Sequence, residues 1–184
     1  MFADIQLHAA QSAKNGKQAA LTQDGESWNI KFPGSYTTSF NASAFQDPDA
    51  NRVTLSINAD EDLRELALNI DAYLLKVVQG DPAKYLGKAM SASEVASGYC
   101  PILRANEGYQ PLVKVKLQKL GRYAVRCWDT SGVRAPVPED WREVVFTPRV
   151  WVKGLWIAQG GKTWGAQLEL VDCQVESQQV PCPF

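Results

Sequence analysis

Two runs rich in apolar and β-branched residues, with cations among them, lie near the C-terminal end of the chain, over 149–175. Residues 149–158 and 164–173 are interpreted as β-strands, in which successive side chains point to opposite faces. Gly160 and Gly161 lie between the two runs, and glycine tolerates the positive φ of a tight hairpin turn. The pattern therefore predicts a β-hairpin.

The alternation also assigns faces within this hairpin. In the first strand, one face carries Arg149, Trp151, Lys153, Leu155 and Ile157, and the other carries Val150, Val152, Trp156 and Ala158. In the second strand, Trp164, Ala166, Leu168 and Leu170 oppose Gln167, Glu169, Val171 and Cys173. Tryptophans and cations, among them Lys162 near the turn, thus share one hairpin. Rings and cations suit a single-stranded nucleic acid, whereas a sheet core also uses tryptophan.

The N-terminal part of the chain shows the same period of two. Asn15-Gly16 and Asp24-Gly25 are strong hairpin signals, and they predict strands near 3–13, 18–23 and 26–32. Trp28 falls on the apolar side of the last strand, so we expect it in the core. A further strand is predicted over 52–58 (RVTLSIN).

Between residues 61 and 78 the period changes to that of an α-helix. Asp60 or Asn58 can cap its start, and Gly80 and Pro82 end it. The acidic residues on its surface are interpreted as a solvated face: Asp62, Glu65 and Asp71. Ser91 and Glu94 have the spacing of a capping box, which predicts a short second helix near 91–98.

Residues 112–118 and 122–128 alternate again, with a turn at Leu120-Gly121 between them, and they predict a second hairpin. One face is apolar, and the other carries the most concentrated positive charge of the chain: Lys114, Lys116, Arg122 and Arg126, with Trp128. Four cations without an acid between them repel one another unless a polyanion neutralises them. This favours a binding face over an ordinary solvated sheet face.

Composition limits what such a face can be. The 184 residues are 45% hydrophobic and 21% charged, which predicts one globular domain over 1–175 followed by a tail over 176–184. The formal net charge is −1, so the whole chain does not attract nucleic acid. A polyanion site must therefore be a local patch of positive charge, and acidic residues elsewhere in the chain must balance that charge.

Other functional classes find little support. No apolar run approaches the roughly 20 residues that span a bilayer. The N-terminus lacks the features of a secretory signal, so an intracellular protein without a membrane partner is expected. Four scattered cysteines and a single His8 predict reduced thiols and no metal or other cofactor. No P-loop, GxSxG, HExxH or Cys/His pair is present, so no enzyme is expected.

The order of elements favours a mainly β fold: an antiparallel, OB-fold-like β-barrel with one clear helix and a short second helix. OB-folds hold single strands against a concave strand face and its loops. Bases would stack on Trp128, Trp151 and Trp164. Phosphates would contact the cations of the two hairpins: Lys114, Lys116, Arg122, Arg126, Arg149, Lys153 and Lys162.

A family resemblance follows from several segments spread over the last two thirds of the chain. They are the amphipathic helix 62–78, residues 85–88 (YLGK), residues 109–111 (YQP) leading to Lys114 and Lys116, and the hairpin with Trp156 and Trp164-Gly165. On these the chain resembles the OB-fold single-stranded DNA-binding proteins of phages and large DNA viruses. The resemblance implies sequence-tolerant binding of single-stranded DNA, with RNA as an alternative, during replication or recombination.

The resemblance also implies replication proteins as partners, and the sequence leaves open whether the chain forms a homo-oligomer. Proteins of this kind often carry an acidic tail that ends in an aromatic residue and recruits those partners. This chain ends in Phe184, but only Glu176 is acidic over 176–184. The main alternative function is a non-catalytic scaffold or virion component on the same barrel, whose aromatic residues would be buried or would form a protein interface.

Overall fold

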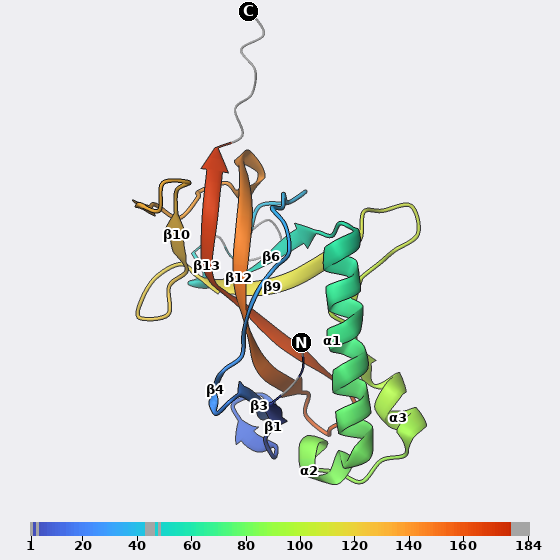
Figure 1. The fold of residues 1–184 in the computed structure, drawn as a ribbon. Helices are drawn as coiled ribbons and strands as arrows, with labels where there is room; N and C mark the ends of the chain where they lie inside the picture. Colours follow the sequence, from blue (N-terminus) through green and yellow to red (C-terminus); the bar gives the residue numbers. More distant parts are fainter. Residues whose placement is uncertain (1, 3, 43–46, 48, 178–184) are drawn as a thin grey trace, which may run out of the picture.

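A long two-stranded hairpin runs through the centre of the molecule (Figure 1). The structure is a computed structural model that describes residues 2, 4–42, 47 and 49–177. β12 (Val144–Ile157) and β13 (Trp164–Ser177) pair antiparallel along their whole length. Gly160 and Gly161, both with positive φ, lie in the turn between them. The hairpin predicted from the alternation is confirmed.

The remaining strands attach to this hairpin directly or through one neighbour. β12 pairs antiparallel with β3 (Gly16–Gln23) and β5 (Asn29–Lys31). β13 pairs parallel with β7 (Tyr99–Cys100), β9 (Leu112–Gln118) and β10 (Arg126–Trp128). The outer strands are β1 (Ile5–Leu7), β2 (Gln11–Ala13) and β4 (Glu26–Ser27) on β3, β6 (Arg52–Asn58) and β8 (Leu103–Arg104) on β9, and β11 (Arg134–Ala135) on β10.

The fold is mainly β, as predicted, but its sheet is mixed. Among the described residues, thirteen strands join in one sheet, and β7, β9 and β10 run parallel to β13 where an antiparallel barrel was expected. The regular ladders do not close into a ring. Isolated bridges, Tyr36 with Phe146 and Thr38 with Ile57, cross the gap between β12 and β6.

The predicted second hairpin is wrong. β9 pairs with β6 and β8, whereas β10 pairs with β13 and β11. The N–H of Val125 still donates to the carbonyl of Gln118, at 2.9 Å, just before the chain departs toward β13. Alternation sets which side chains share a face but not which strand is the partner. Arg122 consequently lies in a loop and not opposite Lys116.

The predicted helices are present, and a third one separates them. α1 (Glu61–Gly80) begins at Asp60, whose carboxylate accepts the N–H of Leu63 at 2.9 Å. α3 (Ala92–Ser97) has the capping box expected from the sequence. Pro82 ends α1, as predicted, but it also starts α2 (Pro82–Leu86), because proline is favoured at the first helical position. A 3₁₀ helix, η1 (Trp141–Glu143), precedes β12.

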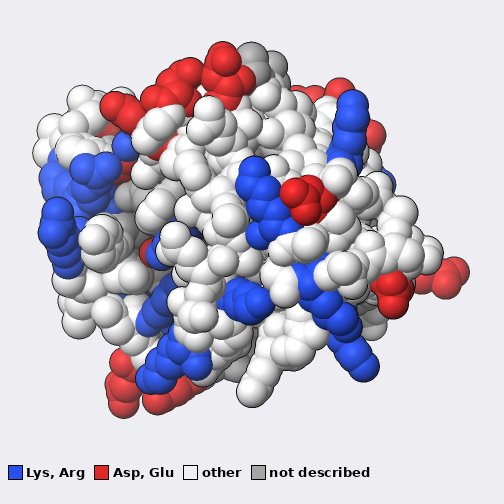
Figure 2. All heavy atoms as spheres, turned by 90° about the horizontal axis from the view of Figure 1, so that it is seen from below, with Lys and Arg blue, Asp and Glu red and all other residues white. Residues whose placement is uncertain are grey.

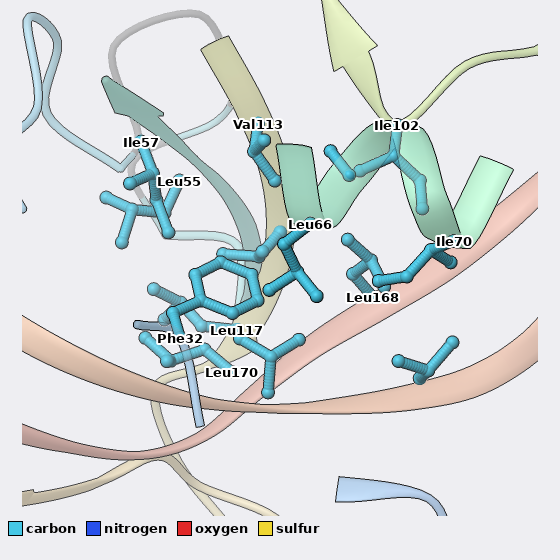
Figure 3. Packing of buried hydrophobic residues seen from close by; sticks show 14 of the residues in the cluster. Phe32, Leu55, Ile57, Leu66, Ile70, Ile102, Val113, Leu117, Leu168 and Leu170 are labelled. Atoms are coloured by element: carbon cyan, nitrogen blue, oxygen red, sulfur yellow. The ribbon is translucent and has the colours of Figure 1, made fainter. Parts of the chain in front are cut away.

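The apolar side of α1 packs against the sheet. Leu66 and Ile70 point toward Leu117, Leu168 and Leu170 of β9 and β13 (Figure 3). The largest fully buried side chains include three indoles, Trp28, Trp141 and Trp164. Trp28 is in the core as predicted. The interior therefore contains half of the six tryptophans in the chain.

Asp71 of α1 is buried, so its interpretation as part of a solvated helix face is wrong. Its carboxylate accepts the O–H of Tyr99 at 2.5 Å and the backbone N–H of Ile102 at 3.1 Å. Burial raises the pKa of Asp71, and these hydrogen bonds oppose that shift. The contacts fasten the segment between α3 and β8 to the middle of α1.

Some predictions concern residues outside the described part of the chain. Of the tail over 176–184, β13 includes the first two residues, and 178–184 lie outside the described residues. The described cysteines, Cys100, Cys127 and Cys173, are free thiols, and Cys182 lies outside. In the part of the chain that the structure describes, no helix has the length and apolar character needed to cross a membrane.

The α1–sheet contact leads to a stability prediction. Leu74 has no exposed surface, so Leu74→Ala should lower the free energy of unfolding by about 2–5 kcal/mol through lost burial and a cavity. Leu68 lies on the same helix with 56% of its surface exposed, and Leu68→Ala should change stability by only about 0.5 kcal/mol. Urea denaturation followed by circular dichroism measures both, and equal losses would contradict this packing.

Candidate nucleic-acid interface

A bulge in β12 decides which side chains face outward. The pairing with β13 shifts between Val152 and Gly154, so that Lys153 is an extra residue in the strand. The buried positions are Val150 and Val152 before the shift and Leu155 and Ile157 after it. Trp156 consequently lies on the outward face with Trp151. The alternation had placed these two indoles on opposite faces, which is wrong.

One row of side chains crosses the sheet on this outward face. Register partners in sequence along the row are Thr54 of β6, Lys116 of β9, Glu169 of β13, Trp151 of β12 and Asn29 of β5. Directly opposed residues of paired strands point to the same side. Lys116 and Trp151 come from separate predicted site segments, and the fold brings them to one face with Glu169 between them.

A second row lies beside the first. It joins Lys31 of β5, Arg149 of β12, Asp172 of β13 and Arg126 of β10. Arg149 and Trp151 are two positions apart in β12, so the rows share a face. A hollow of about 410 Å³ lies along this row, and its lining includes all four residues together with Trp128.

We call the surface formed by these rows and their neighbours the basic face. It consists of seven cations, Lys31, Arg52, Lys114, Lys116, Arg126, Arg149 and Lys153, two carboxylates, Glu169 and Asp172, and three indoles, Trp128, Trp151 and Trp156. The chain as a whole has a net charge of −1, so the remainder is clearly negative. Seen from below, some lysines and arginines gather at one edge and others are scattered over the surface, and acidic side chains lie mostly near the outline (Figure 2).

Glu169 of the first row is the register partner of Lys116 and lies among the cations of the basic face. Only 5% of its side chain is exposed, and its carboxylate contacts Arg52 at 3.1 Å, Lys153 at 3.6 Å and Gln118 at 3.4 Å. The prediction that no acid separates these cations is therefore wrong. The acid was missed because β13 is far from β9 in sequence and beside it in the sheet.

Lys116 is not among the contacts of Glu169. Its ammonium donates to the hydroxyl of Thr54 at 2.5 Å. Burial, followed by the positive charges of Arg52 and Lys114, lowers the pKa of Lys116. A nearby anion would favour the charged form of this lysine. A phosphate bound beside Lys116 would therefore oppose the lowering of its pKa.

Asp172 holds the cations of the second row. Its carboxylate accepts from Arg126 at 2.7 Å, from Nε of Arg149 at 2.9 Å and from the indole N–H of Trp128 at 3.4 Å. Burial raises the pKa of Asp172, but the hydrogen bonds from Arg126 and Arg149 outweigh it, and the pKa is lowered overall. Both guanidinium side chains remain about half exposed, so they can contact a ligand as well.

A hollow on this face lies beside β7 and β9, which both pair with β13. Its volume is about 400 Å³, and its lining includes Arg104, Lys114, Lys116 and Trp156. A Cβ on Gly165 would lie 3.1 Å from the Trp156 ring, so this glycine lets the indole lie across the strand. Trp156 was missed as a site residue. The signal in the sequence was Gly154, because a glycine inside a strand often marks a bulge, and a bulge there turns Trp156 to the outward face.

A smaller hollow of about 250 Å³ lies next to the one that Trp156 lines, and Gln167 lines both of them. Trp151 and Lys153 line this smaller hollow. The ammonium of Lys153 lies 5.1 Å from the centre of the Trp151 ring, and the guanidinium of Arg134 lies 5.3 Å from that of Trp128. Rings and cations are therefore interleaved along the face.

Three predicted site residues are not on the basic face. Trp164 has no exposed surface, its N–H donates to the carbonyl of Val95 at 3.0 Å, and its ring packs against Tyr99. Its prediction as an open stacking ring is wrong, because α3 and β7 cover it. Lys162 lies in the hairpin turn, close to Gly98. Arg122 lies in the loop before β10, over the ring of Tyr123.

Comparison with known proteins gives matches at the level of structure. No protein-family model and no curated protein sequence matches the chain. Among solved structures, gp2.5, a single-stranded DNA-binding protein encoded by bacteriophage T7, matches with a TM-score of 0.46 and 11% identity, covering 82% of this chain and 87% of that one. The matches thus include phage single-stranded DNA-binding proteins, the family that the sequence resembles.

Two structures of the single-stranded DNA-binding protein from bacteriophage Enc34 also match. The complex with single-stranded DNA gives a TM-score of 0.49 and 8% identity, covering 96% of this chain and 98% of that one. The protein without DNA gives 0.48 and 7%, covering 94% and 90%. These values are too low to bear on function, so what this chain binds is inferred from its basic face alone.

The lowered pKa of Asp172 predicts a pH dependence. Because the folded state favours the ionised form, the stability contributed by this carboxylate is present above its ordinary pKa of 3.8 and is lost as the pH falls through the folded value. Wild type should therefore exceed Asp172→Asn in stability at neutral pH, and the difference should shrink in acid. Thermal melts between neutral and acidic pH measure it, with Asp24→Asn at an exposed turn as the control for charge removal. A difference that stays constant with pH would contradict the ion pairs.

Proposed function

We propose that this chain is a non-catalytic protein that binds single-stranded DNA along the basic face. The observation that supports this most is the convergence of side chains from β9, β10 and β12 on one side of the sheet. There Lys116, Arg126 and Arg149 lie beside Trp128 and Trp151, although 35 residues separate Lys116 from Trp151 in sequence. A local concentration of cations with rings between them is what a polyanion with flat bases requires.

The rings favour single strands over duplex. An indole can stack on a base only when that base is free of its partner and its neighbours. Trp151 and Trp156 lie on a sheet face between cations, in two adjoining hollows. A single strand can place its phosphates against the cations and its bases against these rings.

The proposed contacts divide by chemistry. Phosphates would contact the exposed or half-exposed cations, which are Lys31, Arg52, Arg104, Lys114, Lys116, Arg126, Arg149 and Lys153. Bases would stack on Trp151, Trp156 and Trp128, at about 1–3 kcal/mol for each stacked base. Because every base has a flat face, such stacking gives little sequence preference. Arg122 and Lys162 would contribute only if the strand extends beyond the face.

The carboxylates of Glu169 and Asp172 would hold the cations in place before the single-stranded nucleic acid binds. Glu169 contacts Arg52 and Lys153, and Asp172 contacts Arg126 and Arg149. Without these partners, seven cations on one face would repel one another. A bound phosphate can share the exposed part of each guanidinium, so the carboxylates need not be displaced.

In a cell, such a protein would protect or organise single strands during replication or recombination. Binding of RNA, recruitment of replication proteins and assembly into a homo-oligomer are further parts of the proposal. The tail over 176–184 has only one acidic residue, which does not favour recruitment through acidic charge. The competing scaffold function predicts a basic face that protein covers and nucleic acid does not.

Reversal of charge in β9 tests the proposal. Lys114→Glu with Lys116→Glu should weaken binding of a fluorescent oligonucleotide more than about tenfold, because each lost phosphate contact also loses counterion release. The slope of log affinity against log salt should become less steep by roughly 1.4, at about 0.7 for each of two contacts. Fluorescence anisotropy at several salt concentrations measures both quantities.

A matched double variant controls for net charge. Lys76 and Lys84 lie on α1 and α2, and their replacement by glutamate gives the same charge change away from the basic face. This control should retain most of the affinity and the original slope. If both double variants bind alike, β9 is not part of the site. If wild type shows no salt-sensitive binding, the scaffold function is the better explanation.

Two tryptophans of the hairpin should respond differently to truncation. Trp151→Ala should reduce affinity by an amount typical of one stacked base, about 1–3 kcal/mol, while the protein stays folded. Trp164→Ala should instead lower stability by about 3–5 kcal/mol, because its ring fills the core. Tryptophan emission should be quenched by single strands in wild type and less so in Trp151→Ala. Equal quenching by duplex DNA would argue against stacking.

A further inference from the structure

Two hydrogen-bond donors on the basic face lack acceptors. The indole N–H of Trp151 and the amide Nε2 of Gln167 are shielded from solvent and have no hydrogen-bond partner among the described residues. Only one other such side-chain atom occurs there, Oγ1 of Thr38. Buried polar groups in folded proteins are nearly always satisfied, so each exception calls for an explanation. Two exceptions on one proposed binding surface point to a missing acceptor.

The two donors belong to one place in the fold. Gln167 is two positions from Glu169 in β13, and Glu169 is the register partner of Trp151 in β12. Diagonal neighbours of this kind lie about 7–8 Å apart, which long side chains can span. Both residues line the hollow of about 250 Å³, together with Lys153, Gln18 and Ser12. An acceptor in this hollow would lie beside both side chains.

The chemistry of the two donors limits which kind of acceptor can satisfy them. Both are neutral N–H groups withdrawn from water, and a phosphate would have to give up its hydration to reach them, which is unfavourable for a charge. A carbonyl oxygen is neutral, and its two lone pairs can accept from both donors together. A ring nitrogen of a base has one lone pair and can accept from only one of them.

We propose that the hollow between Trp151 and Gln167 is a subsite for one unpaired base that bears a ring carbonyl. The inference rests on the proposed binding of single strands. Thymine, uracil, cytosine and guanine carry such a carbonyl, whereas adenine offers only ring nitrogens and an amino group. The subsite therefore selects against adenine at one position of an otherwise sequence-tolerant face.

Lys153 controls access to this subsite. Its ammonium lies over the Trp151 ring, and its contact with Glu169 is long, at 3.6 Å, with 37% of the lysine side chain exposed. When a phosphate of the bound single-stranded nucleic acid attracts this ammonium, the Trp151 ring and the donors beside it are uncovered. Base entry and phosphate contact are then coupled through one side chain.

The test compares oligonucleotides in wild type and in two variants that keep shape and remove a donor. Trp151→Phe retains a flat ring without the N–H, and Gln167→Met retains a side chain of similar length without the amide. Wild type should bind oligo(dT) and oligo(dC) at least about fivefold more tightly than oligo(dA). Each variant should lose most of this preference, expressed as the ratio of its own affinities for oligo(dT) and oligo(dA), measured by fluorescence anisotropy at one salt concentration.

Gln79→Ala is the matched control, because Gln79 lies on α1 and its amide donates to the carbonyl of Ala92. It should keep the preference. A preference that persists in both donor variants would overturn the subsite, since self-stacking of oligo(dA) would then explain it. Equal binding of all oligonucleotides by wild type would also overturn it and leave single-strand binding intact. Binding of none would overturn the proposed function itself.

Thermal melting of both variants shows whether each is folded under the conditions of the binding assay. If one of them unfolds, the other alone decides the outcome, because each removes one of the two donors. An equal loss of affinity for every oligonucleotide in Trp151→Phe, with the preference retained, would show that the indole contributes by stacking and not by donation, which contradicts the subsite.

Discussion

The pairing of β12 with β13 is the constraint on which the rest of the molecule depends. One edge of β13 is occupied throughout by β12, and its other edge is shared along its length by β7, β9 and β10. The position along β13 therefore decides which strand lies beside it. Lys116 of β9 and Arg126 of β10 reach the same face because their strands join the same edge one after the other.

Irregularities in this pairing are as important as its regular part. The extra residue at Lys153 moves Trp156 outward, and a second register shift between Arg149 and Val150 allows Glu169 and Asp172 to share the outward face. In a strand with strict alternation, one of these two carboxylates would point to the opposite face of the sheet. The bulges thus place two acids and two indoles where they meet the cations.

A basic face on a nearly neutral chain has a physical consequence. Seven cations and two carboxylates give this side a positive potential, and the rest of the surface carries the balancing negative charge. Such a distribution can direct a polyanion to one side of the protein and keep it from the others. The carboxylates also limit repulsion within the face, because each one holds two cations at close range.

The alternation of residues was sufficient to predict the β12–β13 hairpin, the N-terminal turns and β6. The helical period and the capping residues at Asp60 and Ser91 were sufficient for α1 and α3. These features depend on neighbours within a few positions, and so the sequence carries them directly. The same local information selected Lys116, Arg149 and Trp151 as candidate site residues, and the fold places them on one face.

Long-range pairing decided the rest. The assignment of β10 to β13 and not to β9, the burial of Trp164 under α3 and β7, and the acid between the cations all involve residues far apart in sequence. Period-two alternation is the same for every choice of partner strand, and a bulge reverses it without changing composition. The sequence by itself determined the elements and the kinds of side chain available, whereas only the tertiary structure decided which of them share a face, because strand partners are chosen by packing of the whole sheet.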